Sequence, residues 1–266
     1  MLWRLILWYL TLVALGWLTF PLTFSLFGKL SDRGYSLSRN LGLLLWGFGF
    51  WFLGSLGVLR NQPGGVLFAL DLLAAASLWD GWRRRFEIWD WLRTNWRLIL
   101  MAEGVFLVFF AFMALVRASD PAATGTEKPM ELAFINAILN SERFPPHDPW
   151  LSGYAISYYH FGYIITGLLA KITHTSGAVA FNLMLASVFG MSAVGAYGIT
   201  ANLAQVYGTK IKEKLNHLAW ALLGPVFLLF VSNLEAVLEV LHQAGVGWDL
   251  ASGTSPFWEW ANIESL

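Results

Sequence analysis

The sequence contains no cysteine, which excludes disulfide bonds and thiolate metal sites and leaves the redox compartment open. Charge is also scarce, because only 13% of the residues are Asp, Glu, Lys or Arg, and seventeen basic residues balance seventeen acidic ones. Without a net charge there is no reason to expect a nucleic-acid partner. The sequence also lacks three common motifs of soluble enzymes: a phosphate-binding glycine loop, GxSxG and HExxH.

Apolar residues are abundant instead. They make up 57% of the chain, which includes 15 Trp and 20 Phe, and the mean hydropathy is +0.56. This composition predicts an all-α, multi-pass protein of the plasma membrane, with membrane lipids among its partners. A helix needs about 20 apolar residues to cross a hydrocarbon core of roughly 30 Å. Seven segments meet that need, at 2–27, 41–59, 66–82, 95–116, 154–172, 178–201 and 218–241. The first is too long for a signal-peptide core and lacks a cleavage site, so we expect it to be retained.

Basic residues between the spans predict the orientation. Connections 28–40 and 82–96 carry three and four of them (Lys29, Arg33 and Arg39; Arg83, Arg84, Arg85 and Arg93), which is typical of the cytoplasmic side. Segment 117–153 is therefore predicted to be extracytoplasmic. Connection 207–216, with three lysines, conflicts with simple alternation. Either one of spans five and six does not cross fully, or the rule fails there.

The predicted extracytoplasmic loop contains one amphipathic helix. Its apolar face repeats at helical spacing, with Thr126 as the expected N-cap (Met130, Ala133, Phe134, Ala137 and Ile138). We expect this helix to lie on the membrane surface and to end before the proline pair at 145–146. The predicted organisation is helices in 1–116, the loop in 117–153, helices in 154–245 and the start of another loop in 246–266.

The polar residues of this region are the candidates for chemistry. Glu127 and Lys128 stand at the start of the surface helix, where the dipole favours a carboxylate and a lipid headgroup can reach, although Glu127 could be an ordinary first-turn acid. Arg143, His147 and Asp148 form a second cluster, in which Asp148 could simply cap its own turn. A third group, Tyr158, Tyr159 and His160, opens span five. An aromatic belt would explain the tyrosines, so His160 is the better candidate.

Charges inside the spans are the other candidates. Asp71 and Glu103 need a partner or a water-filled cavity, because an ionisable group is costly in hydrocarbon. Glu235, Glu239 and His242 share one face of the last span, where they could hold a metal or form a solvated end. We favour the solvated end, and we predict no metal site from these residues.

Three runs in and after the loop carry a resemblance to a known family. They are residues 125–134 (GTEKPMELAF), 144–154 (FPPHDPWLSGY) and 157–162 (SYYHFG). They resemble uncharacterised archaeal and bacterial membrane proteins named for a Tyr-Tyr-Tyr motif, with His160 in place of the third tyrosine. That family in turn resembles the GT-C superfamily of polytopic glycosyltransferases, such as protein O-mannosyltransferases and the aminoarabinose transferase of lipid A.

The GT-C resemblance implies a fold and a set of roles. It implies a helical bundle with a juxtamembrane helix, and it places Glu127 on the first acid of the superfamily, the catalytic base or acceptor-orienting group. The second acidic position falls on Lys128, which departs from the pattern. Such enzymes are longer, so we expect this chain to be the N-terminal part of a larger protein. Members differ in their need for a divalent metal, which leaves that cofactor open.

The function predicted from residues and resemblance together is sugar transfer from a polyprenyl-phosphate donor to an acceptor outside the cell. Lys128 and Arg143 would meet the donor phosphate, and Glu127 would take or orient the acceptor proton. The remaining candidates, His147, Asp148, Tyr158, Tyr159 and His160, would bind substrate. The alternative is a non-enzymatic transporter or a scaffold subunit of envelope assembly. A transporter would concentrate polar groups in broken helices at mid-membrane, whereas here they concentrate in a loop.

Overall fold

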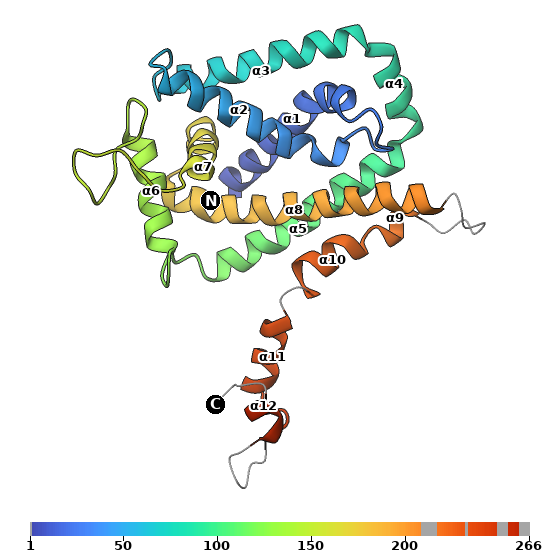
Figure 1. The fold of residues 1–266 in the computed structure, drawn as a ribbon, viewed down its shortest axis with the longest axis vertical. Coiled ribbons are helices and arrows are strands. Elements are labelled where there is room, and N and C mark those ends of the chain that lie inside the picture. The colour runs from blue at the N-terminus through green and yellow to red at the C-terminus, as the bar shows by residue number, and fades with distance from the viewer. Residues whose placement is uncertain (1, 209–216, 232–233, 249–254, 261–266) are drawn as a thin grey trace.

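The structure is a computed structural model that describes residues 2–208, 217–231, 234–248 and 255–260. All its regular elements within these residues are helices, as expected, and one isolated β-bridge joins His147 to Ala155. The main body consists of α1 (Leu2–Leu26), α2 (Ser38–Ser55), α3 (Pro63–Arg83), α4 (Arg85–Thr94), α5 (Trp96–Ser119), α6 (Lys128–Asn140), α7 (Phe161–Ile172) and α8 (Gly177–Gly208). Helices α9 (His217–Trp220) and α10 (Leu223–Leu229) lie beside α8, and α11 (Leu234–Gln243) and α12 (Pro256–Trp260) lie below the main body in Figure 1.

Four of these helices are long and apolar enough to cross a membrane: α1, α3, α5 and α8. They confirm four of the seven predicted spans, at 2–27, 66–82, 95–116 and 178–201. The other three differ from the prediction. Segment 41–59 forms α2, which begins at Ser38 and is not among the four; segment 154–172 is helical only from Phe161; and segment 218–241 is divided among α9, α10 and α11. The other three predicted spans are therefore not confirmed within the residues described.

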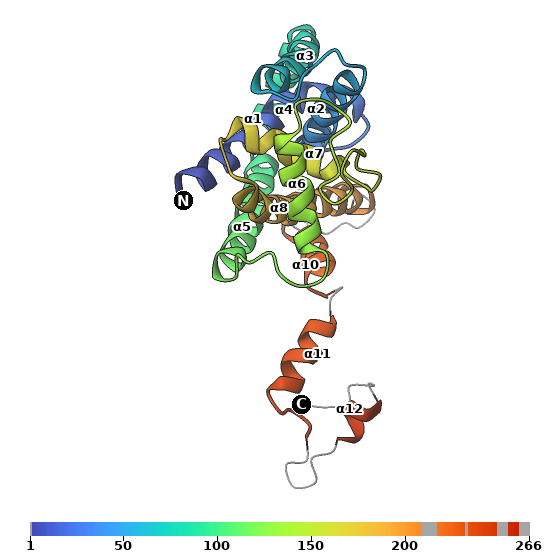
Figure 2. The ribbon, with the colours of Figure 1, turned by 90° about the vertical axis from the view of Figure 1, so that its left-hand side faces the viewer.

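Helix α7 accompanies the loop helix α6 and does not cross the bundle. Its 12 residues extend about 18 Å, well short of a hydrocarbon core of roughly 30 Å. It packs against α6, because Tyr163 Oη donates to Glu131 Oε1 at 3.3 Å near the start of both helices and Lys171 Nζ donates to the Leu139 carbonyl at 3.2 Å near the end of both. Both views show the two helices side by side (Figures 1 and 2).

Helix α8 consequently starts at the loop end of the bundle. Asn182 near its start donates to the Pro121 carbonyl at 3.1 Å, at the loop end of α5. Asn202 near its other end accepts from the Ser31 N–H at 2.8 Å and donates to Asp32 Oδ1 at 2.9 Å, in the basic connection 28–40. The described end of α8 and this connection thus share one end of the bundle, while residues 209–216 lie outside the described residues. The conflict read from the sequence is resolved when α7 is not counted as a crossing and α2, which runs from connection 28–40 to the Asn61 turn at the loop end, is counted as one.

A buried ion pair joins α2 to α5 inside the bundle. Arg39, 1% exposed, forms a salt bridge with Glu103, and its guanidinium carbon lies 4.4 Å from the centre of the Phe106 ring. The Tyr35 hydroxyl donates to the other carboxylate oxygen of Glu103. Glu103 thus has the partner that a membrane-embedded acid requires. Asp71 lies on an exposed face of α3 instead.

The expectation of a solvated end at His242 is wrong. His242 is 3% exposed, and its ring packs against Trp248 and Trp258 with centroid distances of 5.3 and 5.2 Å. Glu239 is exposed, and the Glu235 side chain lies outside the described residues. Among the described residues, no three His, Asp or Glu side chains converge as a metal site would require.

The arrangement of α7 and α8 predicts which end of the bundle faces the outside of the cell and which end faces the cytoplasm. A cysteine at Ala122, in the loop, should react with a membrane-impermeant thiol reagent in intact cells, whereas one at Gln205, near the end of α8, should react only after permeabilisation. The natural chain has no cysteine and gives no background. Labelling of the Gln205→Cys variant in intact cells would show that α7 crosses the membrane after all.

Candidate functional site

Glu127 occupies the N-cap position of α6, where Thr126 was expected, so that prediction was wrong by one residue. Its backbone carbonyl accepts the Glu131 N–H at 3.0 Å, which starts the helix, and Pro129 fits the first turn because its missing N–H is not needed there. The Glu127 side chain makes no capping bond. Its carboxylate is exposed and accepts a hydrogen bond from the Tyr159 hydroxyl at 3.1 Å.

The apolar face of α6 packs against protein and not against lipid. Phe134 and Ile138 are 3% and 1% exposed. Phe134 contacts the Tyr163 ring at 5.7 Å between centroids, and Ile138 packs where α7 has Gly167. The amphipathic pattern was identified correctly, but the surface that covers it is α7. Each such burial contributes roughly 1.5–3 kcal/mol to holding the loop helix on the bundle.

Two matching spacings of four residues bring acids and tyrosines together where α6 and α7 pack. Glu127 and Glu131 are one helical turn apart on the α6 side, and Tyr159 and Tyr163 are four residues apart on the α7 side. Tyr159 pairs with Glu127 and Tyr163 with Glu131, and the Tyr158 and Tyr159 rings contact each other at a tilt of 38°, with centroids 3.9 Å apart. The result is a cluster of two carboxylates and three tyrosines at the exposed edge of the loop.

The Tyr159 and Tyr163 phenols stay protonated. The hydrogen bond with Tyr158, burial and then the Glu127 carboxylate raise the pKa of Tyr159 above its ordinary value. Burial, followed by the charge of Glu131, raises the pKa of Tyr163 to about 12. Near neutral pH both hydroxyls are therefore donors, and they hold the carboxylates in place.

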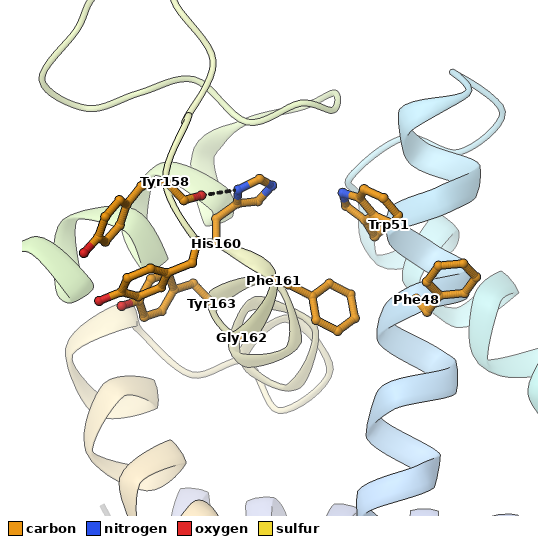
Figure 3. A pocket seen from close by; sticks show the side chains of 8 residues that line it. Phe48, Trp51, Tyr158, His160, Phe161, Gly162 and Tyr163 are labelled. Atoms are coloured by element: carbon orange, nitrogen blue, oxygen red, sulfur yellow. Dashed lines mark hydrogen bonds between the residues drawn. The ribbon is translucent and has the colours of Figure 1, made fainter.

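A groove of about 640 Å³ lies beside the cluster, between α2 and α7. Its α2 wall is Phe48 and Trp51, and its other wall is residues 158–163 (Figure 3). His160 Nδ1 bonds to the Tyr158 carbonyl at 2.8 Å, and its ring projects toward Trp51, away from the Tyr158 and Tyr163 rings (Figure 3). The groove is thus mainly aromatic, with a histidine on one side and phenols on the other.

Arg143, His147 and Asp148 line a second pocket of about 790 Å³. It lies against Asn136 and Asn140 of α6 and shares no lining residue with the aromatic groove. Asp148 Oδ1 accepts the Trp150 and Leu151 N–H groups at 2.8 and 2.9 Å, so it caps its own turn. The structure therefore separates the predicted residues into two groups, and Lys128 lines neither pocket.

The residues that sequence reasoning missed are Phe48, Trp51, Glu131 and Tyr163. The first two lie in the predicted span 41–59, where apolar and aromatic residues are expected. The matched spacing of Glu127 with Glu131 and of Tyr159 with Tyr163 was a usable signal for the others, but it required knowing that residues 161–172 run beside α6.

The loop is tied to the bundle through Asn61, in the turn between α2 and α3. Its side-chain amide donates to the Ile138 and Ser141 carbonyls at 2.6 Å each, at the end of α6. Its own carbonyl accepts Lys171 Nζ at 3.0 Å, and burial lowers the pKa of that lysine. These contacts satisfy carbonyls that every helix end leaves open.

Phe144 attaches the far part of the loop to α2. Its ring packs edge-on against Phe50 at 5.4 Å between centroids. A Cβ at Gly54 would lie 2.9 Å from the Phe144 ring, so the glycine allows the ring to sit directly on the helix backbone. The loop is therefore attached to α2 by the aromatic contact of Phe144 and to the turn after α2 by the hydrogen bonds of Asn61.

One comparison with known proteins gives a result. A family described as "Uncharacterized membrane protein (DUF2298)" matches residues 45–260, which include Phe48 and Trp51, the whole loop and α6 to α8. No curated protein and no solved structure matches the chain.

Replacing Asn61 by Leu should destabilise the loop. The variant keeps the side-chain size but leaves two buried carbonyls without a donor, at a cost of about 1–3 kcal/mol for each unsatisfied group. Thermal unfolding in detergent should show a lower midpoint than wild type, and limited proteolysis should cut the loop sooner. Asn140→Leu is the matched control, because Asn140 is exposed. Equal midpoints for the two variants would contradict the role given to Asn61.

Proposed function

We propose, from the premise that this chain belongs to the DUF2298 family of membrane proteins, that it takes part in sugar transfer on the extracytoplasmic face of the membrane. The donor is a sugar on polyprenyl phosphate, and the acceptor is a hydroxyl compound of the envelope. The reacting site lies where Glu127 meets the tyrosine cluster and the aromatic groove.

The observation that carries this proposal is the exposed Glu127 carboxylate, which accepts a hydrogen bond from Tyr159, beside the neighbouring Tyr158 ring. A sugar ring has apolar C–H faces that pack on aromatic rings and hydroxyl groups that donate to carboxylates. A cluster of phenols and two carboxylates offers both kinds of contact in one place. It is also exposed, so that a substrate can reach it.

The groove between α2 and α7 suits the lipid part of the donor. Its walls are aromatic, and Phe48 and Trp51 belong to a helix of the bundle, so a prenyl chain could enter from the hydrocarbon. Lys128, next to Glu127, is the cation proposed for the phosphate. Arg143 lies in the second pocket and is no longer assigned to the same phosphate.

The proposed step balances without a redox partner. The acceptor oxygen forms a bond to the anomeric carbon while the bond from that carbon to the phosphate oxygen breaks. Polyprenyl phosphate leaves with the bonding electrons, and the acceptor proton passes to the Glu127 carboxylate. Tyr159 keeps its own proton and orients the carboxylate through its hydrogen bond.

Glu127→Gln should abolish transfer without affecting membrane insertion. The change preserves size and the bond to Tyr159 but removes the base, whose loss typically costs about 10²–10⁴-fold in rate. Membranes containing the full-length protein would be supplied with polyprenyl-phosphate hexose and envelope acceptors, and release of free polyprenyl phosphate would be measured.

The matched control is Glu142→Gln, an exposed acid of the same loop that lies outside the aromatic groove. It should retain near-wild-type release. Similar rates for the Glu127 and Glu142 variants would remove Glu127 from the mechanism. Uptake of lipid-linked sugar without release of polyprenyl phosphate, in wild type, would favour transport over transfer.

A further inference from the structure

A second apolar groove lies at the loop end of the bundle, between α1, α5 and α8. It measures about 540 Å³ and is walled by Leu5, Ala114, Val179 and Leu183. Small side chains of α5 leave room there between three long helices that are each apolar enough to cross a membrane. Because the groove lies at the ends of these candidate spans, it falls where acyl chains and headgroups of a bilayer meet.

Arg117 and Asn182 are the polar residues of this groove. Asn182 accepts Arg117 Nε at 2.8 Å and donates to the carbonyls of Pro121 and Ala178 at 3.1 and 2.9 Å. Arg117 Nη2 donates to the Ala122 carbonyl at 3.1 Å. Neutral acceptors thus hold the guanidinium in one orientation. These bonds use Nε and Nη2 and do not involve Nη1.

The charge of Arg117 is not neutralised within the part of the chain that the structure describes. No Asp or Glu oxygen of those residues lies within salt-bridge distance of it, whereas Arg39 and Arg84 both have carboxylate partners. A fixed cation at the end of a transmembrane helix, beside an apolar groove, complements a molecule with an anionic head and an apolar chain. Guanidinium groups bind phosphate oxygens with paired N–H donors.

We propose that this groove binds an anionic glycerophospholipid of the bilayer, with one acyl chain between α1, α5 and α8 and its phosphate on Arg117. The site is independent of the proposed transfer reaction, since it shares no lining residue with the aromatic groove. A lipid in this groove would contact the loop ends of the three helices and also residues 117–122, which lead into the loop. Bound lipid would therefore stabilise the start of that loop.

Native mass spectrometry of the purified protein with added palmitoyl-oleoyl phosphatidylglycerol tests the head contact. Wild type should retain one lipid at concentrations where phosphatidylcholine with the same chains is lost. Arg117→Gln should weaken retention about tenfold, because a charge-assisted bond to phosphate is removed. Arg60→Gln, an exposed arginine at the same end of the bundle, should leave retention unchanged. Equal loss in both variants, or equal retention of the two lipids, would overturn the proposal.

Photo-crosslinking of the wild-type protein tests the chain contact without any variant that could misfold. Phosphatidylglycerol carrying a diazirine in one acyl chain should label peptides that contain residues 111–118 and 178–183. Excess unlabelled phosphatidylglycerol should remove this labelling. Labelling elsewhere would overturn the assignment. So would displacement by polyprenyl phosphate at lower concentration than phosphatidylglycerol, which would make the groove part of the donor site.

Discussion

The arrangement of the whole candidate site depends on how the end of α6 is held by Asn61 and Lys171. A helix end leaves several carbonyls without partners, and burying them unpaired is costly. Here the Asn61 amide and the Lys171 ammonium donate to the carbonyls of Ile138, Leu139 and Ser141. Three segments that are far apart in sequence, the α2–α3 turn, the end of α6 and the end of α7, are thereby fixed at one point.

That attachment explains the placement of α7. With Lys171 held at the end of α6, and Gly167 packed against Ile138, α7 is fixed against α6. Tyr163 and Tyr159 then meet Glu131 and Glu127 in register. The same geometry returns the chain to the loop end of the bundle, so that α8 starts there. One packing arrangement thus decides both the composition of the candidate site and the direction of the last long helix.

The loop end of the bundle carries two features with different chemistry. The aromatic groove is bordered by phenols and carboxylates, which suit neutral, hydroxyl-rich groups. The groove at Arg117 is apolar with one fixed cation, which suits an anionic lipid. Residues 117–127 connect them along the chain. A lipid that orders residues 117–122 would therefore also influence where Glu127 lies, although the two sites bind different molecules.

The sequence by itself determined that this is a helical membrane protein. It also located four of the spans and the amphipathic pattern of α6, and it marked Glu127 as a candidate residue. Those features depend on local composition and spacing, which are readable along the chain. Only the tertiary structure decided that α7 is a partner of α6 and not a span, that Glu127 pairs with Tyr159, and that Arg143, His147 and Asp148 form a separate pocket. The hydropathy of a segment shows that it prefers an apolar environment. It does not show whether protein or lipid provides that environment, so a buried helix and a membrane span have similar sequences.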